Sequence, residues 1–246
     1  MPLTSRPEEI KSIAPLGRLR TTINVGNPIL ATWNAHKTDV DGISVDLAKS
    51  LAAQIGLELE LIPLESAGEA VKVVTNEDAD FGFFALDPKR ASHIFFSTPY
   101  ILIEGCYLTH KTSKITENDQ VDQNHISVVV GKGSAYDLYL TRTLQHASIV
   151  RAPTSPTVVE YFVKSEALVA AGVRQQLEED IKKYEDLKIF EKSFMTIQQA
   201  MGIPRSRPEA AQVLLQRFMM DALKSGLIHQ LIEKHKINGA NVYEAF

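Results

Sequence analysis

The stretch GISVDLAKSLAAQIGLELELIPL, residues 42–64, contains two hydrophobic patterns in succession. Over residues 42–56 the apolar side chains recur every three or four positions and the run ends at Gly56, which predicts an amphipathic helix. Residues 57–64 alternate with a period of two, which predicts a strand. A helix followed directly by a strand is typical of α/β proteins, so we expect that fold class.

The same alternation continues on both sides of this stretch. Further strands are predicted at 21–26, 79–86, 125–131, 147–152, 167–172 and 194–203, and further helices at 67–76, 134–145, 155–163, 173–187 and 208–226, with one more helix to close the chain. The pattern restarts near residue 125, which indicates two α/β lobes rather than one.

The chain would cross between these lobes twice, near residues 103–111 and 192–203. Lobe 1 is then residues 1–106 with 203–246, and lobe 2 is residues 107–202. A cleft between two such lobes is a favoured place for a small ligand.

The composition excludes several classes of protein. The 246 residues carry a net charge of −4, without the concentrated basic face that nucleic-acid binding needs. No apolar run approaches the ~18 residues of a membrane-spanning helix.

The first residues lack the apolar core of a signal peptide, so we expect either a cytoplasmic chain or one whose export signal has been removed. With Cys106 as the single cysteine, no intrachain disulfide can form.

Arg90 stands at a predicted helix start within FGFFALDPKRASHIFFSTPY, residues 81–100. Asp87 can cap free amides, and Pro88 suits the first helical position. A cation in the first turn is disfavoured by the helix dipole, but free amides and a guanidinium together favour an anion, most naturally a carboxylate. The alternative is that Arg90 pairs with a surface acid.

A second helix start lies in VVVGKGSAYD, residues 128–137. The glycines allow close approach of a ligand, and Ser134 and Ala135 would offer their amides at the helix N-terminus. Asp137 follows Ser134 at a spacing similar to a capping box. The G-x-x-x-x-G-K-[ST] phosphate loop is absent, and the segment is equally consistent with an ordinary strand-to-helix turn.

Four stretches together resemble the bacterial extracellular solute-binding proteins of family 3, the amino-acid-binding components of ABC importers. In chain order they are GISVDLAKSLAAQIGLELELIPL, DADFGFFALDPKRASHIFFSTPYI, VVVGKGSAYDLYL and ALKSGLIHQLIEKH. The segment from Asp78 to Tyr100 is the most specific. The resemblance implies a periplasmic-binding-protein type II clamshell, in which two α/β lobes joined by two hinge strands close around a ligand.

The resemblance also implies roles for particular residues. In the family, an arginine at the position of Arg90 grips the α-carboxylate of the ligand, and the loop matching Gly133, Ser134 and Ala135 supplies amides to the same group. A monomeric periplasmic protein that delivers its ligand to an ABC permease is the implied setting.

The chain departs from the family at the site of the ligand's ammonium group. Family members usually carry an aspartate where our alignment has Ala171, which cannot pair with an ammonium. Arg174 adds positive charge nearby, which favours an organic acid without an amino group, such as a dicarboxylate. Glu160 or Asp137 could replace the missing acid and restore amino-acid binding, and Arg174 is otherwise an exposed residue at a helix start.

Four further residues are candidates for lining the site. Ala85 and Phe83 replace the small hydroxyl residues that commonly precede the family's arginine, and Trp33 could add aromatic surface. Gln199 lies in the second hinge segment, where an amide could reach the cleft. Phe83 and Trp33 are equally suited to a plain core, and Gln199 to satisfying backbone groups.

Other functions find less support in the sequence. The seven histidines show no metal-ligand spacing, so we expect no metal and no cofactor. No G-x-S-x-G nucleophile elbow is present, and we expect a binding protein rather than an enzyme. Two alternatives stay open: an enzyme similar to the cyclohexadienyl dehydratases of the same fold, with Glu160 or Glu166 as general acid, and a sensory binding module without a transporter.

Overall fold

A computed structural model describes residues 6–244 and divides them into two compact units. Unit 1 runs to Leu102 and resumes at Gln198, and unit 2 is the continuous segment Ile103–Ile197. The chain passes between them in the strands β7 (Ile101–His110) and β12 (Met195–Pro204). The boundaries predicted from the sequence, after residues 106 and 202, lie four and five residues further along the chain.

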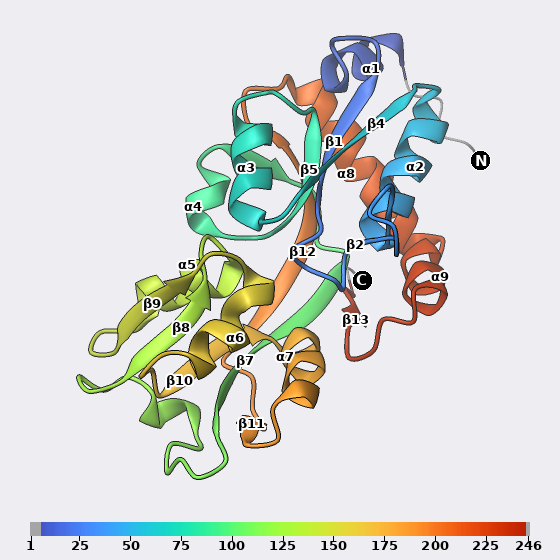
Figure 1. The fold of residues 1–246 in the computed structure, drawn as a ribbon. Helices are drawn as coiled ribbons and strands as arrows, with labels where there is room; N and C mark the ends of the chain where they lie inside the picture. Colours follow the sequence, from blue (N-terminus) through green and yellow to red (C-terminus); the bar gives the residue numbers. More distant parts are fainter. Residues whose placement is uncertain (1–5, 245–246) are drawn as a thin grey trace. The chain divides into compact units, whose positions relative to one another are not determined.

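Unit 1 is a sheet with helices packed on it, and its strands lie in the order β4–β1–β5–β12 (Figure 1). Its elements, besides parts of β7 and β12, are α1 (Pro7–Ile13), β1 (Leu19–Asn24), β2 (Thr32–Trp33), β3 (Val40–Asp41), α2 (Ile43–Ile55), β4 (Leu59–Leu64), α3 (Ala67–Thr75), β5 (Phe81–Ala85), α4 (Pro88–Ala91), β6 (Ile94–Phe96), α8 (Glu209–Lys224), α9 (Leu227–Lys234) and β13 (Asn241–Val242). Strand β1 is parallel to β4 and β5, whereas β12 is antiparallel to β5.

The helix α2 shows how the sequence builds this unit. Its large apolar residues, from Ile43 to Ile55, are all buried, as the spacing predicts. Gly56 ends the helix in the left-handed conformation, with φ of 71°, which glycine adopts without steric cost. The predicted helix–strand pair over residues 42–64 is therefore confirmed.

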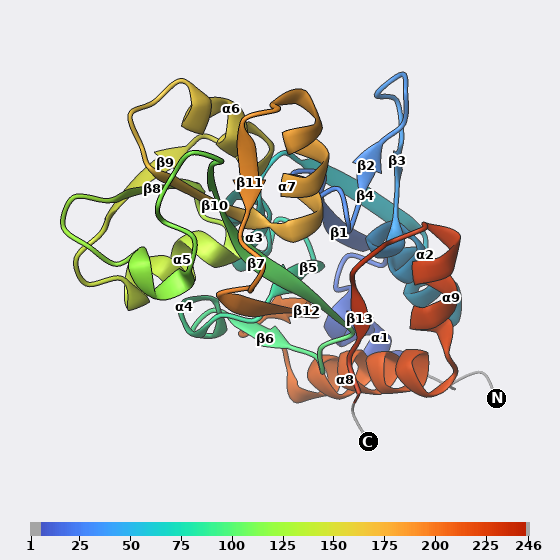
Figure 2. The same ribbon diagram turned by 90° about the horizontal axis from the view of Figure 1, so that it is seen from below.

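The first and last parts of the chain meet in unit 1. Helix α1 packs on α8, and Figure 2 shows the two helices together. An ion pair fixes this contact, because the Arg217 guanidinium donates to the Glu9 carboxylate at 2.9 Å. The C-terminal strand β13 pairs with the start of β7, where Asn241 lies opposite Leu102.

Unit 2 has a sheet and a core of its own. Strands β7–β10–β8–β9 lie in that order, with β8 parallel to β9 and β10, and with β7 antiparallel to β10. Its elements, besides parts of β7 and β12, are the 3-10 helices η1 (Asn118–Gln120), η2 (Ser155–Thr157) and η3 (Ile181–Lys183), the strands β8 (Ser127–Gly131), β9 (Ser148–Ala152), β10 (Val169–Val173) and β11 (Leu187–Ile189), and the helices α5 (Ala135–Thr143), α6 (Val158–Val163) and α7 (Arg174–Asp180).

One predicted helix of unit 2 is wrong in its second half. The run 173–187 was expected to be a single helix, but α7 ends at Asp180 and the 3-10 turn η3 follows. Leu187 then begins β11 and lies opposite His110 of β7. The pairing partner is distant in the sequence, so local periodicity could not indicate the strand.

Within residues 6–244, no helix combines the length and the apolar character that a membrane crossing requires.

Candidate ligand-binding site

Arg90 lies in the short helix α4, directly after β5. Asp87 caps the helix by accepting from the Lys89 and Arg90 amides at 2.8 and 3.3 Å, and Pro88 occupies the first helical position. The predicted helix start is thus confirmed. Since α4 has only four residues, its dipole is small, and any attraction for an anion comes mainly from the guanidinium itself.

The Arg90 side chain is buried but keeps its charge. Only 5% of the residue is exposed, and its Nη1 donates to the Ala85 carbonyl oxygen at 3.1 Å. Burial lowers the pKa of Arg90 to about 10, and the neighbouring Asp87 carboxylate opposes that shift. At neutral pH the guanidinium therefore stays protonated.

Gln199 lies on β12 directly opposite Ala85 of β5, and so belongs to the same part of unit 1. The residue is 5% exposed. The Gln199 backbone carbonyl accepts from the Tyr100 amide at 2.8 Å, so the residue is held within unit 1. It stays a predicted site residue.

Phe83 has a place in the core of unit 1. Its ring makes edge-on contacts with Phe81 and Tyr100, with ring centres 5.7 and 6.3 Å apart. The residue is 4% exposed. These contacts account for Phe83 without a ligand, although they leave its predicted lining role untested.

Trp33 has a charged neighbour that the sequence analysis missed. Its indole Nε1 donates to Glu65 Oε1 at 3.2 Å, and Glu65 is an exposed residue that follows β4. The two residues are 32 positions apart, and no local pattern connects them.

The parallel strands of unit 1 bring these groups to one edge of the sheet. Strands β4, β1 and β5 run side by side in the same direction, so their carboxyl ends share one edge. Glu65 follows β4, and Asp87 with Arg90 follows β5. In open α/β sheets this is the edge at which ligands bind.

The glycine loop of unit 2 enters α5 as predicted, but its amides are partly used. Gly133 has φ of 72°, and its N–H donates to Asp137 Oδ2 at 2.8 Å. The Ser134 N–H donates to the Gly131 carbonyl at 3.0 Å, while its hydroxyl caps the Asp137 amide. Ala135, as the first helical residue, has no acceptor for its N–H within α5. Of the three predicted donors, Ala135 is therefore the best suited to receive an anion.

Arg174 begins α7 and already has partners inside unit 2. Its Nε donates to the Glu104 carboxylate of β7, and its Nη2 donates to the Glu191 carbonyl at 2.8 Å. Burial and the Glu104 partner act on the pKa of Arg174 in opposite directions, and the net shift is upward. Glu104 lies 70 residues before Arg174, so no local sequence pattern predicts this partner. The positive charge of Arg174 is thus matched by a carboxylate.

The acids that could have replaced the missing aspartate also have partners in unit 2. Ala171 is fully buried in β10. Asp137 accepts from the Arg151 Nε at 3.0 Å. Glu160 is exposed and pairs with Lys164, whose hydrogen bond lowers the pKa of the Glu160 carboxyl. Glu166 is exposed as well.

Cys106 is fully buried in β7, and burial raises the pKa of its thiol to about 12. Burial thus disfavours the thiolate, which is the form of cysteine that acts as a nucleophile.

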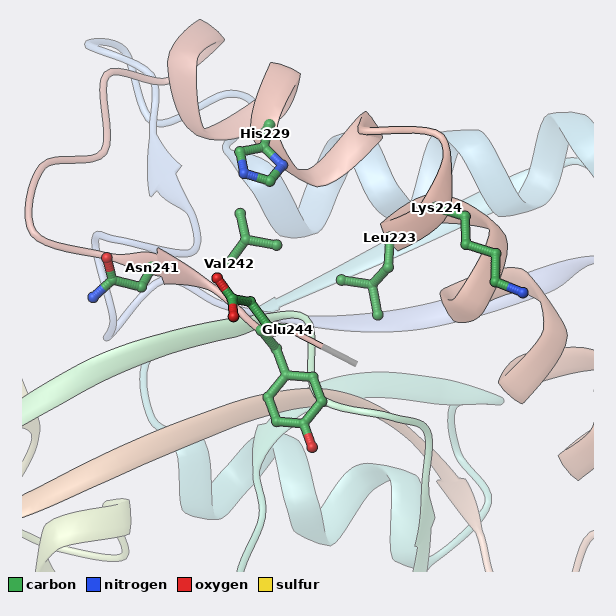
Figure 3. A pocket seen from close by; sticks show the side chains of 7 residues that line it. Leu223, Lys224, His229, Asn241, Val242 and Glu244 are labelled. Carbon is green, nitrogen blue, oxygen red and sulfur yellow. The ribbon is translucent and has the colours of Figure 1, made fainter. Parts of the chain in front are cut away.

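A separate cavity of about 530 Å³ lies in unit 1 near the C-terminal strand. It is lined by Leu223, Lys224, His229, Asn241, Val242, Tyr243 and Glu244. Figure 3 shows His229 of α9 above Val242, with Lys224 directed away from both. None of the residues predicted for the ligand site lines this cavity.

Comparison with known proteins identifies relatives across nearly the whole chain. The family model of the bacterial extracellular solute-binding proteins, family 3, matches residues 26–237. A cyclohexadienyl dehydratase from Pseudomonas aeruginosa is 21% identical over 198 residues, which are 78% of this chain and 73% of the relative.

Solved structures give the same fold. A cysteine-binding protein from Campylobacter jejuni has a TM-score of 0.78 at 16% identity, covering 97% of this chain and 98% of its own. An amino acid ABC transporter substrate-binding protein from Streptococcus pneumoniae, bound to L-arginine, has a TM-score of 0.77 at 20% identity, covering 92% and 97%. The predicted type II fold, with two α/β lobes, is thereby confirmed.

Proposed function

Because the chain belongs to the bacterial extracellular solute-binding proteins of family 3, we propose that it captures a small solute through a carboxylate held by Arg90. One observation carries the proposal: a buried, charged guanidinium lies at the sheet edge where ligands bind in such folds. Delivery to an ABC importer, a periplasmic location and a monomeric state follow from the family and belong to the proposal.

The local charges favour a ligand with a single carboxylate. A dicarboxylate would need a second available cation, and Arg174 is paired with Glu104. Asp87 also lies beside Arg90, so this part of unit 1 carries charges of both signs. A monocarboxylic organic acid or an amino acid matches that balance better than a dianion does.

An amino-acid ligand, unlike an organic acid, needs an acidic side chain to bind its ammonium group, and unit 1 is the place to look for one. Ala171 cannot hold an ammonium group, and Asp137 and Glu160 have basic partners. Asp87 and Glu65 are the acids at the sheet edge that could do so. Relatives that bind L-arginine or cysteine support the amino-acid class, while the absence of an acid at position 171 supports the organic-acid class.

A thermal-shift screen of amino acids, monocarboxylates and dicarboxylates first identifies a ligand. Calorimetry with Arg90 variants then tests whether Arg90 is the anchor that holds the ligand's carboxylate. We expect Arg90→Ala to weaken binding on the order of 100-fold, because a charge-assisted contact is lost. Lys89→Ala is the matched control, since Lys89 is the exposed neighbour in the same helix. An Arg90→Ala variant that binds as tightly as the control would refute the anchor.

A dehydratase is the second candidate function, favoured by the similarity to the cyclohexadienyl dehydratase. Its general acid would have to be protonated near neutral pH. Glu160 is a poor choice because its partner Lys164 lowers its pKa, and Glu166 is exposed. We therefore expect no aromatic product when the protein is incubated with a prephenate-like acid and followed by ultraviolet absorbance. Formation of an aromatic product would show that the protein is an enzyme, contrary to the proposed binding function.

A further inference from the structure

Three side chains of metal-ligating type meet in unit 1, outside the proposed ligand site. They are Asp41 at the end of β3, Asp46 in the first turn of α2 and His235 after α9. One ligand atom from each lies within 4.8 Å of the others. The histidine is 189 residues beyond Asp46, so the fold alone brings the group together.

We propose that Asp41, Asp46 and His235 bind a divalent transition-metal ion, with zinc as the best match. An imidazole nitrogen and two carboxylate oxygens are ordinary zinc ligands. Three protein ligands leave a fourth tetrahedral position for water, as in open zinc sites.

His235 and Asp46, the two less exposed residues of the group, already contact each other. His235 Nε2 lies 2.6 Å from Asp46 Oδ2, and their side chains are 11% and 14% exposed. With metal–ligand bonds of about 2 Å, tetrahedral ligand atoms lie about 3.3 Å apart, so these atoms need to separate by less than about 1 Å. Asp41 Oδ2 now faces the other ring nitrogen, Nδ1, at 3.9 Å, and with 67% of its side chain exposed it can move toward Nε2 to complete the site from the solvent side.

A bound ion would compete with Lys234 for Asp46. Its Nζ lies 2.6 Å from the same Asp46 oxygen, and its side chain is 57% exposed. A divalent ion with two carboxylates and a neutral imidazole is electrically neutral as a group, so the lysine is no longer needed there. Lys234 can turn into solvent, because an exposed pair of this kind holds its lysine only weakly.

The ion would join three elements of unit 1. Asp41 belongs to the β2–β3 hairpin, in which its neighbour Val40 lies opposite Trp33. Asp46 and His235 hold α2 and α9 together. A bound ion would therefore brace the strand that carries Trp33 as well as the contact between the two helices.

Titration of zinc chloride into the tag-free, chelator-treated full chain tests the proposal. Calorimetry is expected to give saturable binding of one zinc per chain, and the melting temperature is expected to rise and to return after EDTA. Absence of saturable binding would overturn the proposal.

Variants locate the site. His235→Gln and Asp41→Asn are each expected to weaken zinc binding about 100-fold or more, since even residues behind the ligands change metal affinity 10- to 100-fold. His229→Gln is the matched control, as an exposed histidine of α9, the helix that His235 follows, and is expected to bind zinc like the parent. If His235→Gln binds like this control, the ion is elsewhere and the proposal fails.

Lys234→Ala separates a metal site from a set of ion pairs. Removing the competing cation is expected to tighten zinc binding about two- to fivefold, the equivalent of an exposed ion pair. If the group serves only to dock α9 on α2, this variant gains no affinity for zinc and simply loses stability. That result would overturn the proposal even if the protein binds zinc somewhere.

Discussion

A guanidinium loses hydration free energy when it is buried, and Arg90 is compensated within its own short segment of chain. The Ala85 carbonyl accepts from Nη1, and the Asp87 carboxylate keeps the pKa from falling further. Asp87 also caps the helix that begins beside it. One carboxylate thus shapes the backbone and sets the local charge at the proposed anchor.

Replacing Asp87 by Asn separates these two effects. Asn still caps a helix but carries no charge. We expect Asp87→Asn to lower the free energy of unfolding by about 1–3 kcal/mol, because a buried cation loses its compensating charge. A monocarboxylate ligand should bind more tightly, since it then supplies the missing negative charge. Urea denaturation and calorimetry measure the two quantities. Loss of binding would instead mean that Asp87 holds a cationic group of the ligand.

The sequence predicted the residues of this segment better than their partners. The cap at Asp87 and the position of Arg90 can be predicted from the sequence, because a helix start depends on residues that are neighbours in the chain. Glu104 opposite Arg174 and Glu65 beside Trp33 were missed, because each pair forms only when separate strands come together. For the same reason, the spacing of histidines along the chain could not predict that His235 lies beside Asp46.

At the scale of elements, an ionic group ties the first strand to the segment after β12. Asp80 is fully buried between β1 and that segment. Its Oδ1 accepts from Arg20 Nη2 at 2.9 Å and from Arg207 Nη2 at 3.2 Å, and its Oδ2 accepts from the Arg20 amide at 2.9 Å. Both arginines pair with this buried carboxylate, and Arg207 has a second, more exposed partner in Glu77 at 3.7 Å.

Asp80→Asn is therefore expected to destabilise the protein strongly. Removing one member of a buried ion pair leaves the other charges unmatched and typically costs about 3–5 kcal/mol. Asp78→Asn is the control, because that side chain is exposed and Arg20 contacts only its backbone carbonyl. The free energies of unfolding in urea provide the comparison. Equal values for the two variants would show that the arginines find other partners or water.

Element prediction succeeded where one pattern ran its full length. The helix α8 buries Ala211, Leu214, Leu215, Phe218 and Ala222 as its spacing predicts. The run 173–187 failed because the 3-10 helix η3 and a turn follow Asp180, and its last residue, Leu187, begins β11, whose partner is β7. Periodicity identifies a face to be buried, but it does not identify what buries it.

For the molecule as a whole, the two units differ in how the chain builds them. Unit 2 is one uninterrupted segment, and its apolar core, which includes Leu108, Val129 and Phe162, lies within that segment. Unit 1 needs both ends of the chain, since β12 pairs with β5 and α8 packs on α1.

A fragment of residues 103–197 is accordingly expected to fold alone, whereas residues 1–102 are not. The first fragment retains the strands β8, β9 and β10 with their core, whereas the second keeps β1 beside β5 but lacks β12, the other strand that pairs with β5. Circular dichroism and urea denaturation would show a cooperative transition for the first fragment only. A non-cooperative fragment 103–197 would mean that its core depends on unit 1.

The pairing of β5 with β12 also sets the order in which a ribosome can complete this protein. Ala85 is synthesised long before its partner Gln199. At about 5–20 residues per second, the interval is on the order of 10 seconds. During that time the apolar strand β5 has an open edge, which is the kind of surface that aggregates or is held by chaperones. Unit 2 can meanwhile fold, so the nascent chain reaches its native state from the middle outward, and the segment that holds Arg90 is among the last to be finished.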